Sequence, residues 1–558
     1  MDKNTILAFI LIAIILLFYP YLVPVRETPG TFEEEKILTE TVETASPTED
    51  IPLITQTQMT VPEEKETENQ VLSMPDESEI FVETDLYRAV FSTKDGAIKS
   101  WQVKNYKSRS DPEKNLQLIK DSTYNLSTEI RFADGTELKG VVYEADRENI
   151  FLTGSEESAD LVLTLRDSNG QVLVEKTYSF YSDRYSFDLT VDTTPIHSQL
   201  DRTGAVFIHW KDGIRFTEVS DNGKNLNRED YYRRTYVMQN GRVNSFKDKD
   251  SSETITGEIM WGATRSKYFE VFIASQEQKI SYFRNHPATS PVEEHYTSMG
   301  FTVGFDRDSG PINTAMIYFG PMDYQIFRSY GMGFENTMNW GWDIIKPFSL
   351  AIYWTLRFLN NYISNYGLVI IILSLLVNTL VLPFTLKSFK SQAAMKKVQP
   401  EMKLIKEKYK NDMQKQQQAT LELYKKHGVN PLGTCLPTLL PMPILYGMFI
   451  VFGATIEFRN ANFIFWINDL SLPEIFFTLP FQIPLYGANV GLMPIIMGLT
   501  MYLQMKETAS GDPNQKMMLY FMPVFLTVLF NNLSSGLILY YTVGNFYRIV
   551  QQRMMKKN

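Results

Sequence analysis

The hydrophobic and polar positions divide the chain into two parts with different periodicities. From Ile80 to about Gly320, short apolar–polar alternations are separated by turn dipeptides such as Asp95-Gly96 and Asn240-Gly241. A period of two predicts strands with one buried face, and Asn-Gly or Asp-Gly between two such runs predicts a hairpin. We therefore expect an all-β sandwich of antiparallel strands over residues 80–330.

The clearest hairpin signal lies between residues 161 and 191. Leu161, Leu163 and Leu165 alternate with other residues, Asn169-Gly170 follows as a turn, and Val172–Phe180 continues the alternation. This arrangement predicts consecutive antiparallel strands that share one buried face.

Long apolar runs dominate the rest of the chain. The first, Ile6–Val23, has eighteen residues, which reach about 27 Å as a helix and span a bilayer core. Poor cleavage residues follow it, so we expect an uncleaved signal anchor over 1–24, with a cleaved signal peptide as the alternative. Five further spans are expected near residues 366–385, 436–456, 490–505, 517–530 and 533–550. The prediction is an α-helical polytopic membrane core of six spans plus the β-sandwich.

Two segments fit neither pattern. Residues 25–79 are acidic and rich in Thr and Pro, so they predict a disordered linker. Residues 331–365 contain the amphipathic run Trp342–Leu359, whose tryptophans, with Lys346 and Arg357, predict a helix at the membrane interface. A short buried helix of the β domain is the alternative.

A lysine-rich segment, residues 386–428, separates two of the spans. It holds eleven lysines and four acids, and short basic loops beside spans stay in the cytoplasm. The β domain and residues 459–487 are then outside, and both termini inside. Helical spacing predicts two antiparallel amphipathic helices, Ser391–Tyr409 and Asp412–Lys426. This hairpin is either a solvated connector or a docking surface for a ribosome, a nascent chain or anionic lipid. Its candidate docking residues are Lys396, Lys397, Lys403, Lys406, Lys408 and Lys410.

Charge and composition exclude several classes of function. Residues 1–340 are acidic and residues 341–558 basic, but membrane-flanking lysines explain the basic half without a DNA partner. A single cysteine, Cys435, excludes an internal disulfide. The five histidines are scattered, and no nucleotide-binding or zinc motif occurs in a supporting context. We expect no enzyme, no metal and no cofactor.

Polar residues recur on one face of several predicted spans. They are Ser374 and Asn378 in one span, Thr500 and Gln504 in another, Tyr540, Tyr541 and Asn545 in the last, and Thr438 near the start of the third. Polar groups in lipid are costly and usually face a partner or a wet cavity. They either form hydrogen bonds between helices or line a hydrophilic groove.

Several motifs resemble the YidC/Oxa/Alb family of membrane protein insertases, closest to the bacterial YidC proteins with a large periplasmic domain. They are VLPFT (Val381–Thr385), VNPLGTCLPTLLPMPI (Val429–Ile444), FRNANFIFWINDLS (Phe458–Ser471), FMPVFLTVLF (Phe521–Phe530) and SSGLILYYTVGN (Ser534–Asn545). The resemblance covers residues from about Trp342 to Gln552. The β domain has a looser match, and the family's domain is a β-supersandwich of the sugar-mutarotase type.

This resemblance implies an insertase and chaperone of the bacterial inner membrane that acts on nascent membrane proteins, alone or beside SecYEG and SecDF. Five core spans would enclose a hydrophilic groove, open to the cytoplasm and the lipid but closed to the periplasm. The chain departs from the family at Asn378, where a basic residue usually stands, so we expect a polar but uncharged groove. Two rival interpretations are a transporter or channel, and a periplasmic carbohydrate-binding or sugar-modifying module on a membrane anchor.

Overall fold

The computed structural model describes residues 76–557 with gaps at 121–122, 155–156, 219–228, 248–250, 276, 287–298, 411, 429–441, 484–485 and 509–512. All described residues belong to one compact unit, Leu72–Asn558. The predicted anchor over 1–24 lies outside the described residues, as does nearly all of the linker over 25–79. Thr438 and the first residues of the span near 436–456 also lie outside them.

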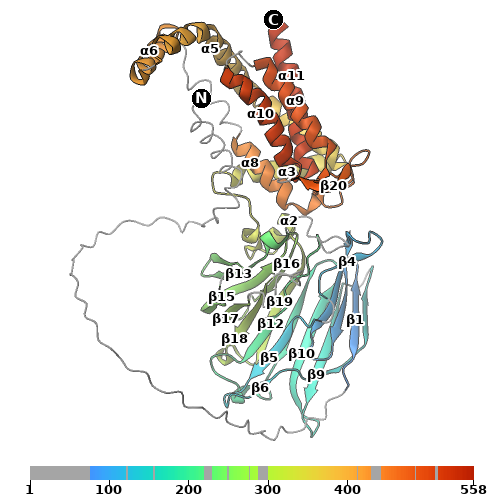
Figure 1. Ribbon diagram of the computed structural model, residues 1–558. Helices are drawn as coiled ribbons and strands as arrows, with labels where there is room; N and C mark the ends of the chain where they lie inside the picture. The colour runs from blue at the N-terminus through green and yellow to red at the C-terminus, as the bar shows by residue number, and fades with distance from the viewer. Residues whose placement is uncertain are drawn as a thin grey trace, which may run out of the picture. The chain divides into compact units, whose positions relative to one another are not determined.

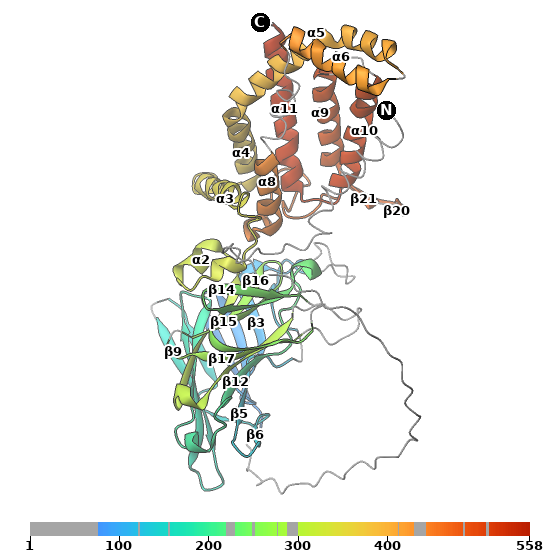
Figure 2. The same cartoon turned by 90° about the vertical axis from the view of Figure 1, so that its left-hand side faces the viewer.

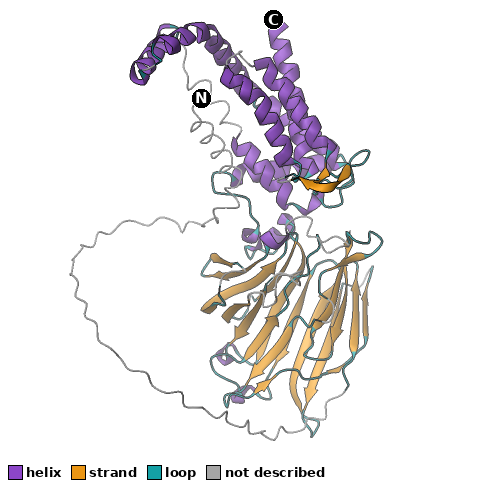
Figure 3. Ribbon diagram, in the orientation of Figure 1, coloured by secondary structure: helices purple, strands orange, loops and turns teal. Residues whose placement is uncertain are grey.

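Strands occupy the chain from Glu79 to Pro321 and form two sheets (Figure 1, Figure 3). The smaller sheet has the order β4 (Asn115–Gln117), β3 (Ile98–Lys107), β2 (Tyr87–Ser92), β1 (Glu79–Thr84) and β8 (Asn149–Leu152). The larger sheet follows the order β6 (Glu137–Leu138), β5 (Ser127–Arg131), β12 (Val206–Trp210), β18 (Gly300–Phe305), β17 (Ile280–His286), β15 (Thr254–Arg265), β16 (Phe269–Ala274), β19 (Ile312–Pro321), β11 (Ser186–Asp192), β10 (Val172–Tyr181), β9 (Ser158–Arg166) and β7 (Glu144–Ala145). Off this path, β13 (Arg234–Gln239) pairs with β14 (Arg242–Phe246) and β15.

The predicted hairpin is confirmed in β9, β10 and β11, which pair antiparallel in sequence order. Asn169-Gly170 turns the chain between β9 and β10, and Gly170 has a φ of 81°, which favours glycine. One pairing differs from the antiparallel expectation, because β1 and β8 run parallel. More than sixty residues separate these two strands, which is long enough for the crossover that a parallel pair requires.

Aromatic side chains fill the space between the two sheets. The Phe91 ring of β2 lies 5.2 Å from that of Tyr178 and 5.3 Å from that of Phe180, both on β10. Trp101 of β3 stacks on Phe319 of β19 at 5.1 Å. All five side chains are buried. Since these contacts join strands of different sheets, the predicted all-β sandwich is confirmed.

Helices follow the strands. They are α2 (Tyr324–Ser329), α3 (Lys346–Asn360), α4 (Tyr366–Leu380), α5 (Leu382–Lys408), α6 (Met413–Lys426), α8 (Met442–Ala454), α9 (Leu492–Thr508), α10 (Pro513–Phe530) and α11 (Ser535–Lys557). Figure 2 shows α11 beside α4 and α9, and α10 beside α9. The helix α3 packs against α4 and α8. Within the part of the chain that the structure describes, no helix is both long and apolar enough to cross a membrane. The six spans stay a prediction.

The segments after the β domain add two details to the sequence prediction. The first helix of the lysine-rich hairpin begins at Leu382 rather than Ser391, because α5 continues almost directly from α4 after a break at Val381. The segment 459–487, which was predicted to lie outside, contains β20 (Phe477–Ile483), and β20 pairs with β21 (Gly487–Val490) in a two-stranded hairpin.

Candidate functional site

Polar side chains of α4 meet the backbone of α11. The Ser374 hydroxyl donates to the carbonyl oxygen of Tyr540 at 3.0 Å, and Asn378 Nδ2 donates to the Ser374 carbonyl at 2.8 Å. Ser374 and Asn378 are both buried. A methyl group on Gly544 of α11 would lie only 3.2 Å from Asn378 Nδ2. The glycine therefore allows α4 and α11 to approach closely at the level of Asn378.

The neighbouring face of α11 meets α9 through Asn545. Asn545 Nδ2 donates to the Met497 carbonyl at 3.4 Å and lies 3.5 Å from Thr500 Oγ1. The Thr500 hydroxyl donates to the same Met497 carbonyl at 2.8 Å. Asn545 and Met497 are buried. The structure thus brings Asn378 and Asn545, from separate predicted spans, to adjacent positions around one helix.

The other predicted site residues lie around this centre. Tyr540 is buried, and the Tyr541 ring lies 5.2 Å from that of Phe530 on α10. Gln504 is half-buried on α9, about one turn beyond Thr500. Thr438 lies outside the described residues, so its place in the site stays a prediction.

Sequence reasoning missed two residues of this site, Arg548 and Gln552. Tyr541, Asn545, Arg548 and Gln552 follow one another at spacings of four, three and four residues. All four therefore share one face of α11. Arg548 is half-buried and Gln552 is buried. The spacing in the sequence already contained this signal. Arg548 places a positive charge about one turn from Asn545 on α11, and the prediction of an uncharged groove did not take this residue into account.

An acidic side chain in the segment before α9 fixes the start of that helix. The carboxylate of Glu474 accepts hydrogen bonds from the backbone N–H groups of Met493 at 2.7 Å and Leu492 at 3.2 Å. The first N–H groups of a helix have no partner within the helix and carry partial positive charge, so a carboxylate stabilises them. The indole N–H of Trp466 donates to Glu474 as well.

The same segment holds the start of α11. The backbone N–H of Ser535 donates to Leu472 at 2.8 Å, and that of Gly536 donates to Leu470 at 3.0 Å. The Ser535 hydroxyl donates to the Asp469 carbonyl at 2.8 Å. The Ser-Ser-Gly sequence is therefore engaged in backbone contacts that position α11 beside α9.

The lysine-rich hairpin has a small core of its own. Val398 of α5 and Leu423 of α6 are buried against each other, and the Tyr424 hydroxyl donates to the Met402 sulfur at 3.2 Å. Five of the six candidate docking lysines have exposed side chains: Lys397, Lys403, Lys406, Lys408 and Lys410. The sixth, Lys396, lies in α5.

A buried ion cluster connects the β domain to the segment after α8. Glu218 accepts from Arg109 Nε at 2.6 Å and from Arg459 Nε at 2.8 Å. Arg109 also pairs with Asp469 and donates to the Ser471 hydroxyl at 3.1 Å. Burial alone would raise the pKa of Glu218, but the two guanidinium groups outweigh it and lower this pKa to about 2.

A second contact of this kind involves Arg357 of α3. Its Nη1 donates to Asp323 at 2.7 Å and to the Tyr353 hydroxyl at 2.9 Å, and lies 3.4 Å from Glu457. Burial, together with the charge of Asp323, raises the pKa of Glu457 to about 7 despite Arg357. A cavity of about 400 Å³ opens between the two ion clusters.

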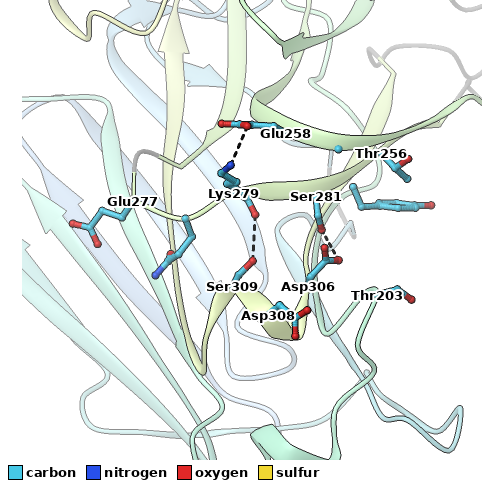
Figure 4. Close-up of a pocket in the computed structure, with 12 residues that line it drawn as sticks. Thr203, Thr256, Glu258, Glu277, Lys279, Ser281, Asp306, Asp308 and Ser309 are labelled. Carbon is cyan, nitrogen blue, oxygen red and sulfur yellow. Dashed lines mark hydrogen bonds and ion pairs between the residues drawn. The ribbon is translucent and has the colours of Figure 1, made fainter.

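The β domain has an acidic cavity of about 600 Å³ beside the start of β17 and the end of β18 (Figure 4). Its polar groups largely satisfy one another: Lys279 pairs with Glu258 at 3.0 Å, and the Ser281 hydroxyl donates to Asp306 at 2.7 Å. Within the described residues, no group of three or more His, Cys, Asp or Glu side chains is arranged to hold a metal ion.

Two family models together match most of the chain. One, described as the YidC periplasmic domain, matches residues 79–351, and the other, described as the 60Kd inner membrane protein, matches residues 358–558. The two matched ranges meet within α3, after β19, the last strand of the β domain.

Curated relatives match the chain along its whole length. The membrane protein insertase YidC of Chloroherpeton thalassium is 32% identical over 571 residues, covering 99% of this chain and 95% of that protein. The protein of the same name from Syntrophus aciditrophicus is 31% identical over 585 residues, covering both chains fully. A solved structure described as an active YidC insertase with the first transmembrane domain resolved is 17% identical, with a TM-score of 0.36, and covers 87% of this chain and 94% of that one. From the family models and the full-length relatives, the chain belongs to the YidC family of membrane protein insertases, inner membrane proteins with a periplasmic domain.

Proposed function

We propose that this chain helps integral membrane proteins to insert, fold and assemble through a hydrophilic groove between α4, α9 and α11. The observation that carries the proposal is the gathering of Ser374, Asn378, Thr500 and Asn545 around α11. Both asparagines donate through Nδ2. Neither carboxamide oxygen receives a hydrogen bond from any residue that the structure describes. These oxygens are acceptors that an incoming polar segment can use.

The groove would lower the cost of moving a client's polar loop into the membrane. An unsatisfied backbone or side-chain polar group costs several kcal/mol in hydrocarbon. Asn378 and Asn545 would supply hydrogen bonds, and Arg548 would attract acidic groups near the cytoplasmic end. Transfer of the client's apolar segment into lipid then supplies the driving force without ATP.

The membrane arrangement is part of this proposal. Six spans, with both termini in the cytoplasm, would place the β domain and residues 459–487 in the periplasm. The exposed lysines of α5 support a cytoplasmic hairpin that meets the ribosome, a nascent chain or anionic lipid. We also propose that the chain acts by itself or together with SecYEG and SecDF, and this part of the proposal is supported only by the family resemblance.

The test replaces both asparagines, Asn378→Leu and Asn545→Leu, in full-length protein reconstituted into vesicles. We expect insertion of clients with charged translocated loops to fall at least several-fold more than insertion of clients with neutral loops. The control is Thr355→Leu at a half-buried position of α3, where the hydroxyl donates to the Ala351 carbonyl of the same helix. Equal loss for both kinds of client would refute the groove. Solute flux through wild-type protein in the same vesicles would instead favour a transporter.

A further inference from the structure

The cavity of about 400 Å³ beside the ion clusters is built from the ends of several elements. It is lined by Asn105, Tyr106 and Lys107 from the end of β3, Asp323 before α2, Arg357, Asn360 and Asn361 from the end of α3, Tyr366 of α4, and Ile456, Glu457, Arg459 and Asn460 after α8. Four of these twelve residues are asparagines and five are charged. Such a lining can hydrogen-bond a polar ligand on many sides.

Two buried atoms of lining residues lack partners. Arg459 uses Nε on Glu218 and Nη1 on the Lys107 carbonyl at 2.9 Å, while its Nη2 has no partner within the described residues. Asn360 Oδ1 is likewise buried and without a partner in that part of the chain. One is a charged donor and the other a neutral acceptor. Buried polar groups in this condition are rare and costly, so each calls for a bound group to complete it.

The charges around the cavity allow an anion. Lys107, Arg357 and Arg459 contribute three positive charges, and Asp323, Glu457 and the Glu218 carboxylate paired with Arg459 contribute three negative ones. Burial raises the pKa of Glu457 to about 7, so this carboxyl is substantially protonated near neutral pH and one positive charge is then in excess. A guanidinium with a free N–H suits a phosphate oxygen.

Exposed aromatic residues lie directly beside the lining residues of α3. Phe358 and Tyr362 flank Asn360 and Asn361 in the sequence, are 60% and 76% exposed, and have ring centroids 5.3 Å apart. Trp354, one turn earlier, is 42% exposed. Aromatic side chains at the end of an amphipathic helix are typical of the membrane interface. A headgroup in the cavity would therefore leave its acyl chains next to an apolar surface.

We propose that this junction cavity is a binding site for a phosphate ester that also carries a hydrogen-bond donor, such as a phosphoglycerol lipid headgroup. The phosphate would meet Arg459 Nη2, and a hydroxyl of the headgroup would donate to Asn360 Oδ1. Bound lipid would then connect α3, the segment after α8 and the end of β3. The membrane placement of α3 rests on the family, whereas the cavity and its free atoms do not depend on the client groove.

The experiment uses delipidated full-length protein in detergent and native mass spectrometry to count bound lipid. Phosphatidylglycerol is compared with diacylglycerol, which lacks the phosphate, and with soluble glycerol 3-phosphate. Arg459→Lys keeps the charge beside Glu218 but removes the spare N–H groups, and Asn360→Ala removes the acceptor. Thr355→Ala, at a half-buried position of α3 that does not line the cavity, is the matched control.

We expect phosphatidylglycerol to bind at least ten-fold more tightly than diacylglycerol. We expect each variant to bind phosphatidylglycerol about ten-fold more weakly than wild type, and the control to bind it as tightly as wild type. If glycerol 3-phosphate binds as tightly as phosphatidylglycerol, and both variants weaken its binding to the same extent, the phosphate site is supported and its ligand is a soluble phosphate ester. If Arg459→Lys does not fold, Asn360→Ala alone decides. Binding that is unchanged in the folded variants, or no stronger for phosphatidylglycerol than for diacylglycerol, overturns the proposal. Because the readout is binding rather than insertion, failure here leaves the groove unaffected.

Discussion

Arg459 and Glu218 form a buried ion pair with 2.8 Å between Nε and Oε1, although 241 residues separate them in the sequence. Their side chains are 1% and 0% exposed. The pair joins the segment after α8 to the β domain, and Arg109 shares the same carboxylate from the end of β3. One acid between two cations therefore forms a central part of the contact between the strand-rich and helical parts.

We expect Glu218→Gln to destabilise the full-length protein by about 3–5 kcal/mol, because it leaves buried guanidinium groups without their counter-charge. The measurement is denaturant unfolding in detergent, followed by tryptophan fluorescence. The control is Glu258→Gln, which removes an exposed pair with Lys279 and should cost less than about 1 kcal/mol. Similar losses in both variants would contradict the role of the cluster.

The same cluster should respond to acid. The pKa of Glu218 is lowered to about 2 in the folded protein from an ordinary value of 4.5. Its contribution to stability is therefore fully present above about pH 4.5 and is lost as the pH falls toward 2. The melting temperature of wild-type protein should fall more steeply between pH 6 and 3 than that of Glu218→Gln, because the variant has no titrating carboxyl at position 218.

Glu270 should act in the opposite direction. It is fully buried on β16, and burial raises its pKa to about 8, although Arg265 and the Thr337 hydroxyl oppose the shift. The folded state holds a proton that the unfolded state releases, so stability from this group is lost as the pH rises from about 4.5 through 8. We expect Glu270→Gln, which resembles the protonated acid, to lose less melting temperature than wild type between pH 5 and 8. A parallel decline in both proteins would contradict the buried proton.

Gly498 should be intolerant of a side chain. A methyl group there would lie 1.9 Å from Thr527 Oγ1 on α10 and 3.3 Å from the Pro523 carbonyl. We expect Gly498→Ala to destabilise the packing of α9 on α10 by about 1–3 kcal/mol, and Thr527→Ala to relieve part of that loss in the double variant. The measurement is a double-mutant cycle: thermal melting of wild type, Gly498→Ala, Thr527→Ala and the double variant.

Gly453→Ala on α8 is the control for this cycle. Its nearest neighbour would be the Tyr232 hydroxyl at 3.7 Å, an ordinary contact, so its effect should be small. Additive effects of Gly498→Ala and Thr527→Ala would indicate that the two positions do not share the space.

The hairpin after α8 and its preceding loop should contact lipid at the outer interface. Four phenylalanine side chains of this segment are 49–84% exposed: Phe465, Phe476, Phe477 and Phe481. The rings of Phe465 and Trp466 stack, with their centroids 5.8 Å apart. We expect a nitroxide at Phe481→Cys, in a Cys435→Ser background, to meet oxygen more often than a water-soluble nickel complex in nanodiscs. A nitroxide at Glu258→Cys on the β domain should show the reverse. A water-like result at position 481 would contradict the interfacial placement.

Local pattern was sufficient for much of the fold. The alternation around Asn169-Gly170 predicted β9, β10 and β11, because a strand with one buried face needs a period of two wherever it packs. The aligned polar residues of α4, α9 and α11 were also visible, since helical spacing fixes which residues share a face. Arg548 follows the same spacing near the end of the predicted span 533–550, but it was not included among the polar residues of that face.

The sequence by itself determined the periodicity of each segment, the sites of its turns and the family to which its motifs point. Only the tertiary structure decided which polar faces meet, because Ser374 reaches Tyr540 across 166 positions and Arg109 reaches Asp469 across 360. It likewise decided that Glu474 caps α9 and that a polar cavity forms beside Arg459. Contacts of this kind depend on how the chain closes long loops and on which buried charges find partners, and neither is encoded in a local pattern.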